Sequence, residues 1–579
     1  MKRIILGLIG TMLTIVGMVA QTKAFPTAEG FGSLTQGGRG GQVVEVTNTT
    51  DDATSPATGS LRWALQQYPN EALTVVFRTS GLIDLKAELR CKRNYLTIAG
   101  QTAPGDGICI KGNKVNFGGS THLIIRHMRF RIGVMLTASG TPDASGKGSI
   151  GIENASNFIL DHCTFGWSAE ENMTIYDNTN TTIQWCILHE GLYNSGHNKG
   201  VRSYGSQWGG QSATYHHNLL AHNYNRSPRF NGARSNDANV LIDYVNNVNY
   251  NWGKSNSCYG GDIENQTHRV NFVNNYYKPG PARPGSSSSF FVQSSVSSSQ
   301  TTDKIALWYM TGNYIEGSAN SGKNTDNYTG LDASAYVAKG VNAASLKSTT
   351  PFTVPYAVNT ETAANAYTNV LAKAGAFPRD TVDRRIVNEV KTGTATGKGT
   401  VQYYYSGGAQ NPSSMYNQTL GIIDDPAAVG GYPTYNTYNA IIDNDHDGMD
   451  DAWETTNGLN PTDSSDRNLL TESGYTVLEV YLNSLVGESI PLNIISGKKE
   501  ILKKKVFEFG KTNGSIYVKC ENEISIMRIV DLNAKIHFET KPKSTIASTP
   551  ITNLPKGVLI MEVTDKLNNK ENFKFINKE

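Results

Sequence analysis

A basic turn at residues 225–230, with the sequence NRSPRF, carries two arginines three residues apart. Pro228 fixes the backbone between Arg226 and Arg229, so both guanidinium groups project from one stiffened loop. Upstream, Glu170 and Glu171 form an adjacent pair of carboxylates, which suits a hard cation that takes oxygen ligands. Neighbouring side chains can point opposite ways, so the pair supplies either one ligand or two.

An acidic loop at residues 443–454 predicts a second cation site. Oxygen ligands fall at loop positions 1, 3, 5, 9 and 12, which are Asp443, Asp445, Asp447, Asp451 and Glu454. Gly448 occupies position 6, where the backbone turns sharply, and Met449 can offer its carbonyl at position 7. This is the EF-hand pattern for Ca²⁺. Nothing in the loop suggests chemistry, so we expect a structural site. The loop resembles those of thrombospondin type-3 and dockerin-like segments.

Charge limits the partners of the chain. The formal net charge of the 579 residues is +2, and residues 497–579 hold 16 Lys and Arg against 10 Asp and Glu. With the three cations of residues 1–24 set aside, residues 25–496 carry −7. A general basic surface for nucleic acid or another polyanion is therefore excluded, and an anionic ligand has to be held by local cations or by bound metal.

A short strand pattern recurs along the chain and predicts a solenoid. The matching positions are Met128, Cys163, Cys186, Asn218, Asn247, Asn275 and Asn313, at steps of 23 to 38 residues. A repeat of this length with variable insertions is typical of stacked coils, in which asparagines lie above one another and share amide hydrogen bonds at a bend. Cys163 and Cys186 fall on consecutive coils, where they either form a disulfide or remain buried thiols.

The chain divides into four predicted parts. Residues 1–24 have the form of a secretory signal peptide that ends at Ala20 or Ala24, and no later stretch is apolar enough to anchor the chain in a membrane. Residues 25–440 hold the coils, closed by a helix at LRWALQQY that Ser60 caps, and loops with a helix near 361–374. Residues 441–490 hold the acidic loop and the amphipathic run GYTVLEVYLNSLV. Residues 497–579 alternate in short strands that predict a small β-sandwich.

Six motifs, in order, resemble the pectate lyases of polysaccharide lyase family one. They are AEGFG (28–32), GGRGG (37–41), GSLRWAL (59–65), IAGQTAPGDGI (98–108), ILDHCTFGWSAEE (159–171) and NRSPRF (225–230). The resemblance implies an all-β fold, a right-handed parallel β-helix. It also implies a secreted enzyme, whether extracellular, at the cell surface or periplasmic, that cleaves α-1,4-polygalacturonate in pectin by β-elimination to 4,5-unsaturated products. The C-terminal segment resembles sorting domains of the type IX secretion machinery of Bacteroidetes.

The resemblance also assigns roles to individual residues. Arg226 matches the catalytic base, and Arg229 and Lys199 match substrate-binding cations, although Lys199 read alone is a solvated loop residue. Glu170 and Glu171 match ligands of a Ca²⁺ that bridges protein and substrate carboxylates. Asp161 and His162 belong to the LDH motif, and we expect them to make structural hydrogen bonds under the cleft.

Two departures from the family pattern weaken this assignment. Lys147, Gly148 and Ser149 stand where the family supplies another Ca²⁺-binding Asp, so either Asp143 substitutes or the site binds weakly and depends on substrate. Asn231 stands where the family often has a further Arg, a role that could pass to Arg234.

Two other functions fit a solenoid. A β-helix glycoside hydrolase needs paired carboxylates on either side of the scissile bond, and the sequence shows no paired-Asp strand motif. A non-catalytic pectin-binding or adhesin-like protein is favoured by the missing Ca²⁺-binding acid. Unsaturated products, saturated reducing ends or no new ends from polygalacturonate distinguish the three.

Overall fold

The computed structural model describes residues 22–577 except 138–139, 141–142, 144, 232–239, 263–266, 298–303, 400–416, 496–506, 513, 534 and 567–569. The chain divides into two compact units, residues 1–498 and 499–579. Most of the predicted signal peptide falls outside the described residues. Ala24, however, already belongs to the first unit, because its N–H donates to the Ser33 carbonyl at 2.7 Å. The Lys23 carbonyl accepts from Arg39 Nη2 at 2.7 Å.

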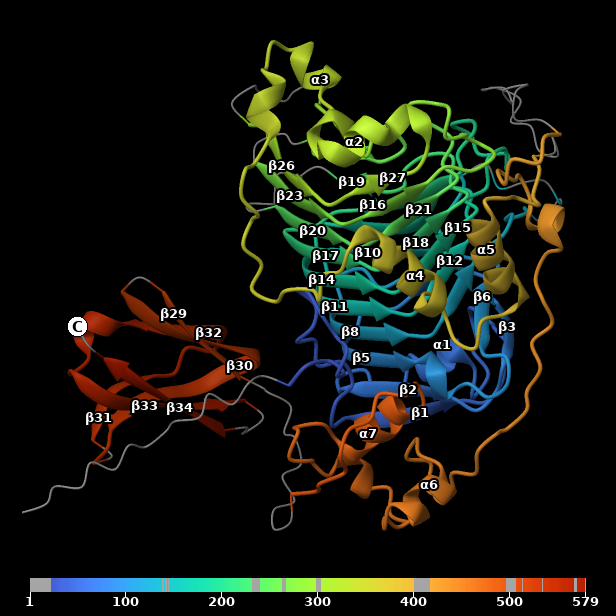
Figure 1. Cartoon of the computed structure of the whole chain (residues 1–579). Coiled ribbons are helices and arrows are strands. Elements are labelled where there is room, and N and C mark those ends of the chain that lie inside the picture. The colour runs from blue at the N-terminus through green and yellow to red at the C-terminus, as the bar shows by residue number, and fades with distance from the viewer. Residues whose placement is uncertain are drawn as a thin grey trace, which may run out of the picture. The chain divides into compact units, whose positions relative to one another are not determined.

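Three parallel sheets build the first unit, and each coil adds a strand to each sheet (Figure 1). Sheet A contains β1 (Gln42–Val46), β2 (Leu73–Phe77), β5 (Asn94–Ala99), β8 (Thr121–Arg126), β11 (Ser156–Asp161), β14 (Thr179–Gln184), β17 (Ser212–His216), β20 (Leu241–Val245), β23 (His268–Val273) and β26 (Ala306–Thr311). Sheet B contains β3 (Gly81–Asp84), β6 (Ile108–Lys111), β9 (Arg129–Arg131), β12 (Thr164–Gly166), β15 (Ile187–His189), β18 (Leu219–Ala221), β21 (Val248–Tyr250), β24 (Tyr276–Lys278) and β27 (Tyr314–Ile315). Sheet C contains β4 (Leu89–Arg90), β7 (Val115–Asn116), β10 (Ile150–Glu153), β13 (Glu171–Tyr176), β16 (Tyr204–Trp208), β19 (Arg229–Phe230), β22 (Tyr259–Gly260), β25 (Val292–Ser294) and β28 (Leu331–Asp332). The predicted parallel β-helix is confirmed.

Interior residues of successive strands lie in register with one another, and one such position can be followed along the whole of sheet A. Along sheet A the paired positions run Val75, Ile98, Ile125, Leu160, Ile183, Tyr215, Tyr244, Phe272 and Met310. All of them are buried in one continuous core. The early coils are therefore filled by aliphatic side chains and the later ones mainly by aromatic rings, which demand more room per layer.

The bend between sheets A and B carries the predicted asparagine ladder. The backbone N–H of Asn218 donates to Asn247 Oδ1 at 3.0 Å, Asn247 N–H to Asn275 Oδ1 at 2.9 Å, and Asn275 N–H to Asn313 Oδ1 at 2.9 Å. The left-handed backbone falls one residue earlier than the ladder, as at His217 with φ of 53° and Asn246 with φ of 55°. The side-chain oxygen of each ladder asparagine thus accepts from a backbone N–H of the preceding coil, at a turn where sheet pairing is interrupted.

Helices cover part of the coil surface. Those before residue 360 are α1 (Leu61–Ala64), α2 (Ser321–Thr325) and α3 (Ser334–Val337), and those after it are α4 (Ala363–Lys373), α5 (Thr381–Thr392), α6 (Asp451–Thr456) and α7 (Val477–Ser484). Ser60 caps α1 by accepting from the N–H of Trp63, as predicted. The helix α4 was expected, whereas α5 was not, although Asp380 at its start and Gly393 at its end are recognisable caps. Both helices pack on sheet B (Figure 1).

All six cysteines are buried free thiols. Cys163 and Cys186 stack on consecutive coils without a disulfide. The backbone N–H of Cys163 donates to the sulfur of Cys186 at 3.4 Å. Burial raises the pKa of the Cys186 thiol well above its usual value, which keeps this side chain a neutral filler.

The second unit is a separate antiparallel β-structure with its own core. Its strands are β29 (Phe507–Thr512), β30 (Ser515–Asp531), β31 (Ile536–Thr540), β32 (Ser544–Pro550), β33 (Gly557–Asp565) and β34 (Lys570–Asn577). The long strand β30 pairs with β29 and β32 through its first part and with β31 and β33 through its last part, so one strand serves both halves.

The ladder predicts a stability effect that depends on burial. Asn247→Ala leaves the backbone N–H of Asn218 without an acceptor, takes away one of the two acceptors of the Asn218 side-chain amide, and removes a bond to the Tyr215 carbonyl. We expect the free energy of unfolding of the first unit to fall by about 3 kcal/mol, measured by denaturant titration. Asn365→Ala, on the exposed face of α4, is the matched control and should change it by less than about 0.5 kcal/mol. Equal losses of unfolding free energy in the two variants would contradict a stabilising role of the asparagine ladder.

Candidate active site

Successive strands of sheet C bring the predicted basic turn beside the predicted acidic pair. Glu171, at the start of β13, lies in register with Tyr204 of β16, and Tyr204 bridges to Asn225 just before the turn. One coil further, Arg229 of β19 lies in register with Tyr259 of β22. Residues separated by up to 88 positions in the sequence thus meet on one face of the sheet.

Arg226 is held on several sides. Its Nη1 donates to Glu171 Oε1 in a short ion pair, and its Nε donates to the Tyr259 hydroxyl at 3.2 Å. Its guanidinium carbon lies 4.1 Å from the centre of the Tyr204 ring, which is the geometry of a cation–π contact. The backbone of Arg226 is left-handed, with φ of 55°. The turn therefore presents this side chain in a fixed, largely desolvated position.

The second arginine of the turn has a different partner. Arg229 Nη2 donates to Asp262 Oδ2 at 3.1 Å. Burial alone would lower the pKa of Arg229, but the charges of Asp262 and Tyr259 outweigh burial. The net effect raises the pKa, so Arg229 keeps its positive charge. Asn231, where a further Arg was considered, is buried and donates to the Ile175 carbonyl at 2.6 Å. It is a structural residue, and Arg234 lies outside the described residues.

The two adjacent glutamates face different partners. Glu170 pairs with His197 Nε2 at 2.6 Å and with Arg202 Nη2 at 3.3 Å, whereas Glu171 pairs with Arg226 and accepts from Gln207 Nε2 at 2.9 Å. Burial would raise the pKa of Glu170, but the hydrogen bond from His197 and the charge of Arg202 lower it. Each carboxylate is already neutralised by an arginine. This donor set does not fit Ca²⁺, which would have to displace Arg202 and Arg226.

The remaining predicted residues lie at the edge of the cluster. Lys199 is exposed on its loop, and its backbone N–H donates to His197 Nδ1 at 2.9 Å. Asp143 Oδ1 accepts two hydrogen bonds from Ser145, one from the backbone N–H at 2.9 Å and one from the hydroxyl at 2.7 Å. The structure therefore brings Lys199 near the cluster through His197, but it gives no sign that Asp143 replaces the missing acid.

Sequence reasoning missed six members of this site. Two of them, His197 and Asp262, pair with Glu170 and Arg229, respectively. Arg202 and Tyr204 form a pair, with the guanidinium carbon 5.2 Å from the ring centre and Nη1 3.0 Å from the hydroxyl. Gln207 and Tyr259 hold Glu171 and Arg226, respectively. These residues lie about one coil away in the sequence from the residues they contact. That spacing could have indicated them, but only with the strand register known.

The acidic loop forms a compact group of carboxylates. Ligand oxygens of Asp443, Asp445 and Asp447 lie within 4.8 Å of one another, and so do those of Asp447, Glu454 and Asp466. Burial and the neighbouring acids raise the pKa of Glu454 to about 8. Asp466 was not predicted, whereas the predicted Asp451 lies outside the group and accepts from the backbone N–H of Asn444 at 2.9 Å. The Met449 side chain is packed in a hydrophobic cluster.

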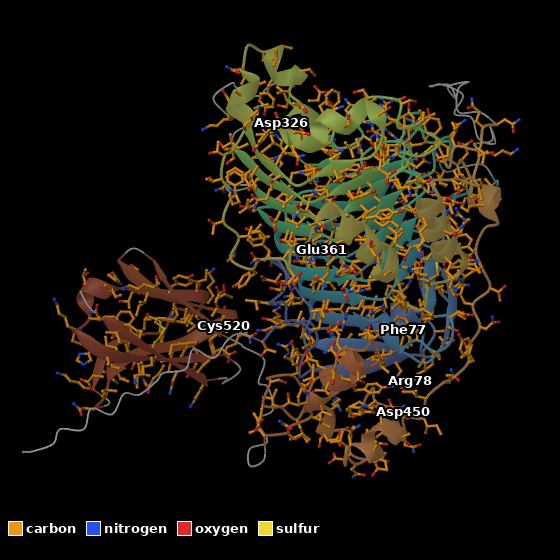
Figure 2. All side chains as sticks on the ribbon, in the orientation of Figure 1. Phe77, Arg78, Asp326, Glu361, Asp450 and Cys520 are labelled. Carbon is orange, nitrogen blue, oxygen red and sulfur yellow. The ribbon has the colours of Figure 1, made fainter. Side chains whose placement is uncertain are left out.

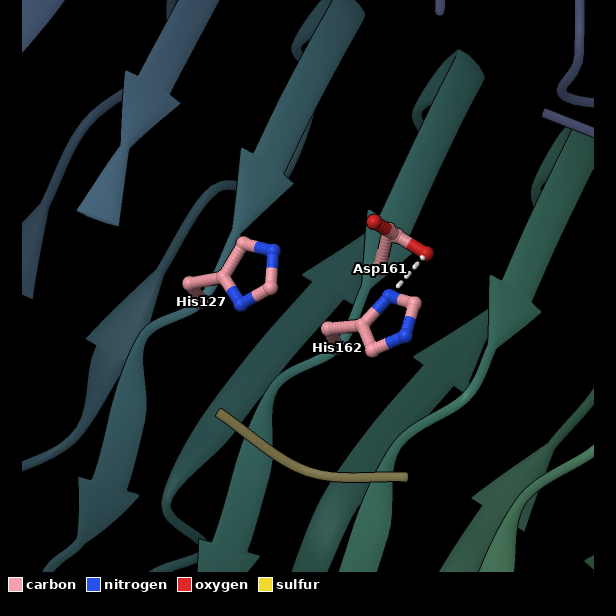
Figure 3. Close-up of side chains that lie close together, drawn as sticks. All are labelled: His127, Asp161 and His162. Atoms are coloured by element: carbon pink, nitrogen blue, oxygen red, sulfur yellow. Dashed lines mark hydrogen bonds and ion pairs between the residues drawn. The ribbon is translucent and has the colours of Figure 1, made fainter. Parts of the chain in front are cut away.

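A third cluster lies at the bend between sheets A and B (Figure 3). Asp161 accepts from His162 Nδ1 at 2.8 Å and from Arg126 Nε at 2.7 Å. Burial, together with the charges of His162 and Arg126, lowers the pKa of the neighbouring His127. The His127 and His162 rings stack at 5.1 Å. They line a separate cavity of about 1230 Å³. His127 and His162 thus border this cavity and not the sheet C cluster, with Asp161 buried beside them. The structural role expected for the LDH residues stays a prediction.

The fold places the chain among parallel β-helix proteins, and sequence comparison identifies the family. A probable pectate lyase C of Aspergillus fumigatus is 32% identical over 470 residues, which cover 81% of this chain and 95% of that protein. One of Aspergillus flavus is 30% identical over 479 residues, with 82% and 97% covered. The crystal structure of a cedar pollen allergen is 18% identical, with a TM-score of 0.41, over 60% of this chain and 92% of that one. No family model matches the chain.

The chain belongs to the pectate lyase family. The predicted enzyme class is therefore confirmed, while the roles of individual residues stay predictions. No helix among the described residues is long and apolar enough to cross a membrane.

The site geometry predicts a role for the Tyr204 ring in turnover. Tyr204→Leu removes the π face on which Arg226 rests, whereas Tyr204→Phe keeps it. We expect turnover to fall about tenfold in the first variant and less than about twofold in the second, since a cation–π contact of this kind contributes about 1–2 kcal/mol. Tyr356→Leu, at an exposed tyrosine away from sheet C, is the control. Equal losses in the Leu and Phe variants would show that the hydroxyl, not the ring, matters.

Proposed function

We propose that this chain cleaves polygalacturonate by β-elimination at the cluster around Arg226. The observation that carries the proposal is the contact of Arg226 with Glu171, Tyr204 and Tyr259, which holds one guanidinium in a desolvated position at the centre of a cationic face. Arg202, Arg229 and Lys199 supply further positive charge around it. A uronate polymer offers one carboxylate per unit to such a face.

In this mechanism Arg226 removes the C5 proton of the sugar whose C4–O4 bond is to be cleaved. The C5–H electron pair becomes the C4–C5 double bond, the C4–O4 bond breaks, and O4 takes a proton from solvent. Arg226 must be neutral to accept the proton, and in this structure its guanidinium is bound to Glu171. Substrate binding therefore has to loosen this pair.

The substrate-binding residues have distinct tasks. Arg229 is fixed by Asp262 and lies over the Tyr259 ring at 5.7 Å, so it offers an oriented cation to a sugar carboxylate one coil from Arg226. Lys199, which is exposed, offers a mobile one. Neutralising the carboxylate makes the C5 proton more acidic, which is the electrostatic part of the catalysis.

We further propose that Ca²⁺ is a structural cofactor bound by the acidic loop. Its support is the group of buried carboxylate oxygens without a hydrogen-bond partner among the described residues, such as both oxygens of Glu454 and of Asp445. At Glu170 and Glu171 the carboxylates are neutralised by arginines, so the proposed proton transfer needs no step through Ca²⁺.

Secretion is the third part of the proposal. The signal-like residues 1–24 and the separate C-terminal unit support export, with the C-terminal unit as the element that secretion machinery would recognise. The proposed domains are a coil domain to residue 440, the calcium segment at 441–490 and the C-terminal β-structure from 497. A non-catalytic pectin binder is the alternative that the same cationic face allows.

Arg226→Ala tests the main proposal. We expect the formation of unsaturated uronide from polygalacturonate, followed by ultraviolet absorbance, to fall by about a thousandfold or more, because the base is lost. Arg226→Lys should also be poor, since an ammonium cannot reproduce the planar fork. Arg229→Ala is the matched variant in the same turn and should raise KM more than it lowers kcat. A folded Arg226→Ala protein with near-normal turnover would overturn the assignment, and wild-type protein that yields no new ends would favour the binder.

The calcium loop predicts a stability effect without a catalytic one. Asp447→Ala combined with Glu454→Ala removes two buried carboxylates of the loop, so the rise in melting temperature on adding Ca²⁺ should be largely lost. Turnover at low temperature should stay within about twofold of wild type, because Arg226 lies on other coils. A full Ca²⁺-dependent shift in the double variant would mean that the loop is only an acidic turn.

A further inference from the structure

The calcium loop is completed by a residue outside its own pattern. Asp466 lies twelve residues beyond Glu454, in the turn that follows α6. One of its oxygens accepts from the N–H of Asn460 at 3.2 Å, and the other, Oδ1, is buried without a partner among the described residues. One carboxylate oxygen of Asp466 lies within 4.8 Å of ligand oxygens of both Asp447 and Glu454.

The surrounding oxygens point to an ion at this position. Glu454 and Asp447 are fully buried, and three of their four carboxylate oxygens have no hydrogen-bond partner in the described chain. Unpaired buried carboxylates are costly unless they coordinate a cation. Oxygen donors from a flexible set of carboxylates suit Ca²⁺ better than Mg²⁺, which keeps most of its water.

The loop is also joined to the first coils of the β-helix. Asp443 forms a short ion pair with Arg78, which directly follows β2, and Arg78 Nε pairs with Glu45 of β1 at 2.6 Å. Figure 2 marks the position of Arg78. His446 Nδ1 lies 2.9 Å from a Glu45 oxygen, so the loop reaches this carboxylate directly through His446 and indirectly from Asp443 through Arg78.

Apolar contacts reinforce this junction. Met449 is buried with Val76 of β2, Ala99 of β5 and the apolar face of α7. Gly448 has φ of 101°, and a side chain there would approach Val43 to 3.1 Å, so the loop backbone lies directly on β1. Movement of the loop would therefore disturb the first strands of sheet A.

We propose that Asp466 is a ligand of the loop's Ca²⁺ and that the bound ion clamps three segments, the loop, the turn at residues 460–466 and the first coils of the β-helix. The inference rests on the proposed calcium loop and deepens it. Asp451, which the sequence pattern favours as a ligand, is engaged by Asn444 and contributes much less. Ca²⁺ then fixes the end of the solenoid at which strand pairing starts.

The ligand assignment is tested on the full chain by calorimetric titration with Ca²⁺ after chelation. Asp466→Asn should weaken Ca²⁺ binding by about tenfold or more, and Asp451→Asn, the same chemical change on the neighbouring segment, by less than about threefold. Absence of any Ca²⁺ binding by wild type would overturn the calcium loop itself. Binding by wild type with the opposite ranking of the two variants would overturn only the assignment of Asp466.

The clamp is tested by hydrogen exchange with and without Ca²⁺. We expect removal of Ca²⁺ to increase amide exchange in β1, β2 and β5 by about tenfold or more and to leave β20, β23 and β26 unchanged. Asp466→Asn should show the same pattern at a Ca²⁺ concentration that just saturates wild type, and high Ca²⁺ should restore protection, which separates weak binding from misfolding. Unchanged exchange in the first strands on chelation would overturn the clamp even if the ion binds.

Discussion

Fixed register between successive coils is the constraint on which the rest of this molecule depends. Each coil is joined to the next by backbone hydrogen bonds in three sheets and by buried amides at the bend between sheets A and B. A slip of one residue would turn the core side chains of a strand outward. The contact of Glu171 with Arg226 exists only because β13, β16 and the turn before β19 keep this register.

The site is balanced in charge before substrate arrives. Glu170 and Glu171 are matched by Arg202 and Arg226, and Asp262 is matched by Arg229. Such pairing stabilises desolvated side chains. A uronate carboxylate is therefore not only the group to be neutralised. It also competes with the protein's own acids for the arginines.

Much of this arrangement could be predicted from the residues, and the failures have physical reasons. The recurring Asn positions gave the solenoid, because stacked coils demand like side chains at one slot. The position of Asp466 beside Asp447 and Glu454 could not be foreseen, since it depends on how the turn at 460–466 is placed relative to α6. Arg202 and Tyr204 were missed because strand register, not sequence spacing, brings them beside Glu170 and Arg226. The helix α5 was missed although its caps and its apolar face, Val382, Ile386, Val387 and Val390, could be read from the sequence.

The six cysteines, none of which forms a disulfide, carry a practical consequence. Cys91, Cys109, Cys163, Cys186 and Cys258 lie inside the coil unit, and Cys520 lies in the C-terminal unit, all of them buried. A thiol-specific reagent can react only when the surrounding structure opens. The protein thus contains intrinsic labelling positions for both units, and the mass and rate of labelling would separate opening of the C-terminal unit from opening of the β-helix without any engineered probe. It also means that the chain can be reduced completely without losing a covalent link.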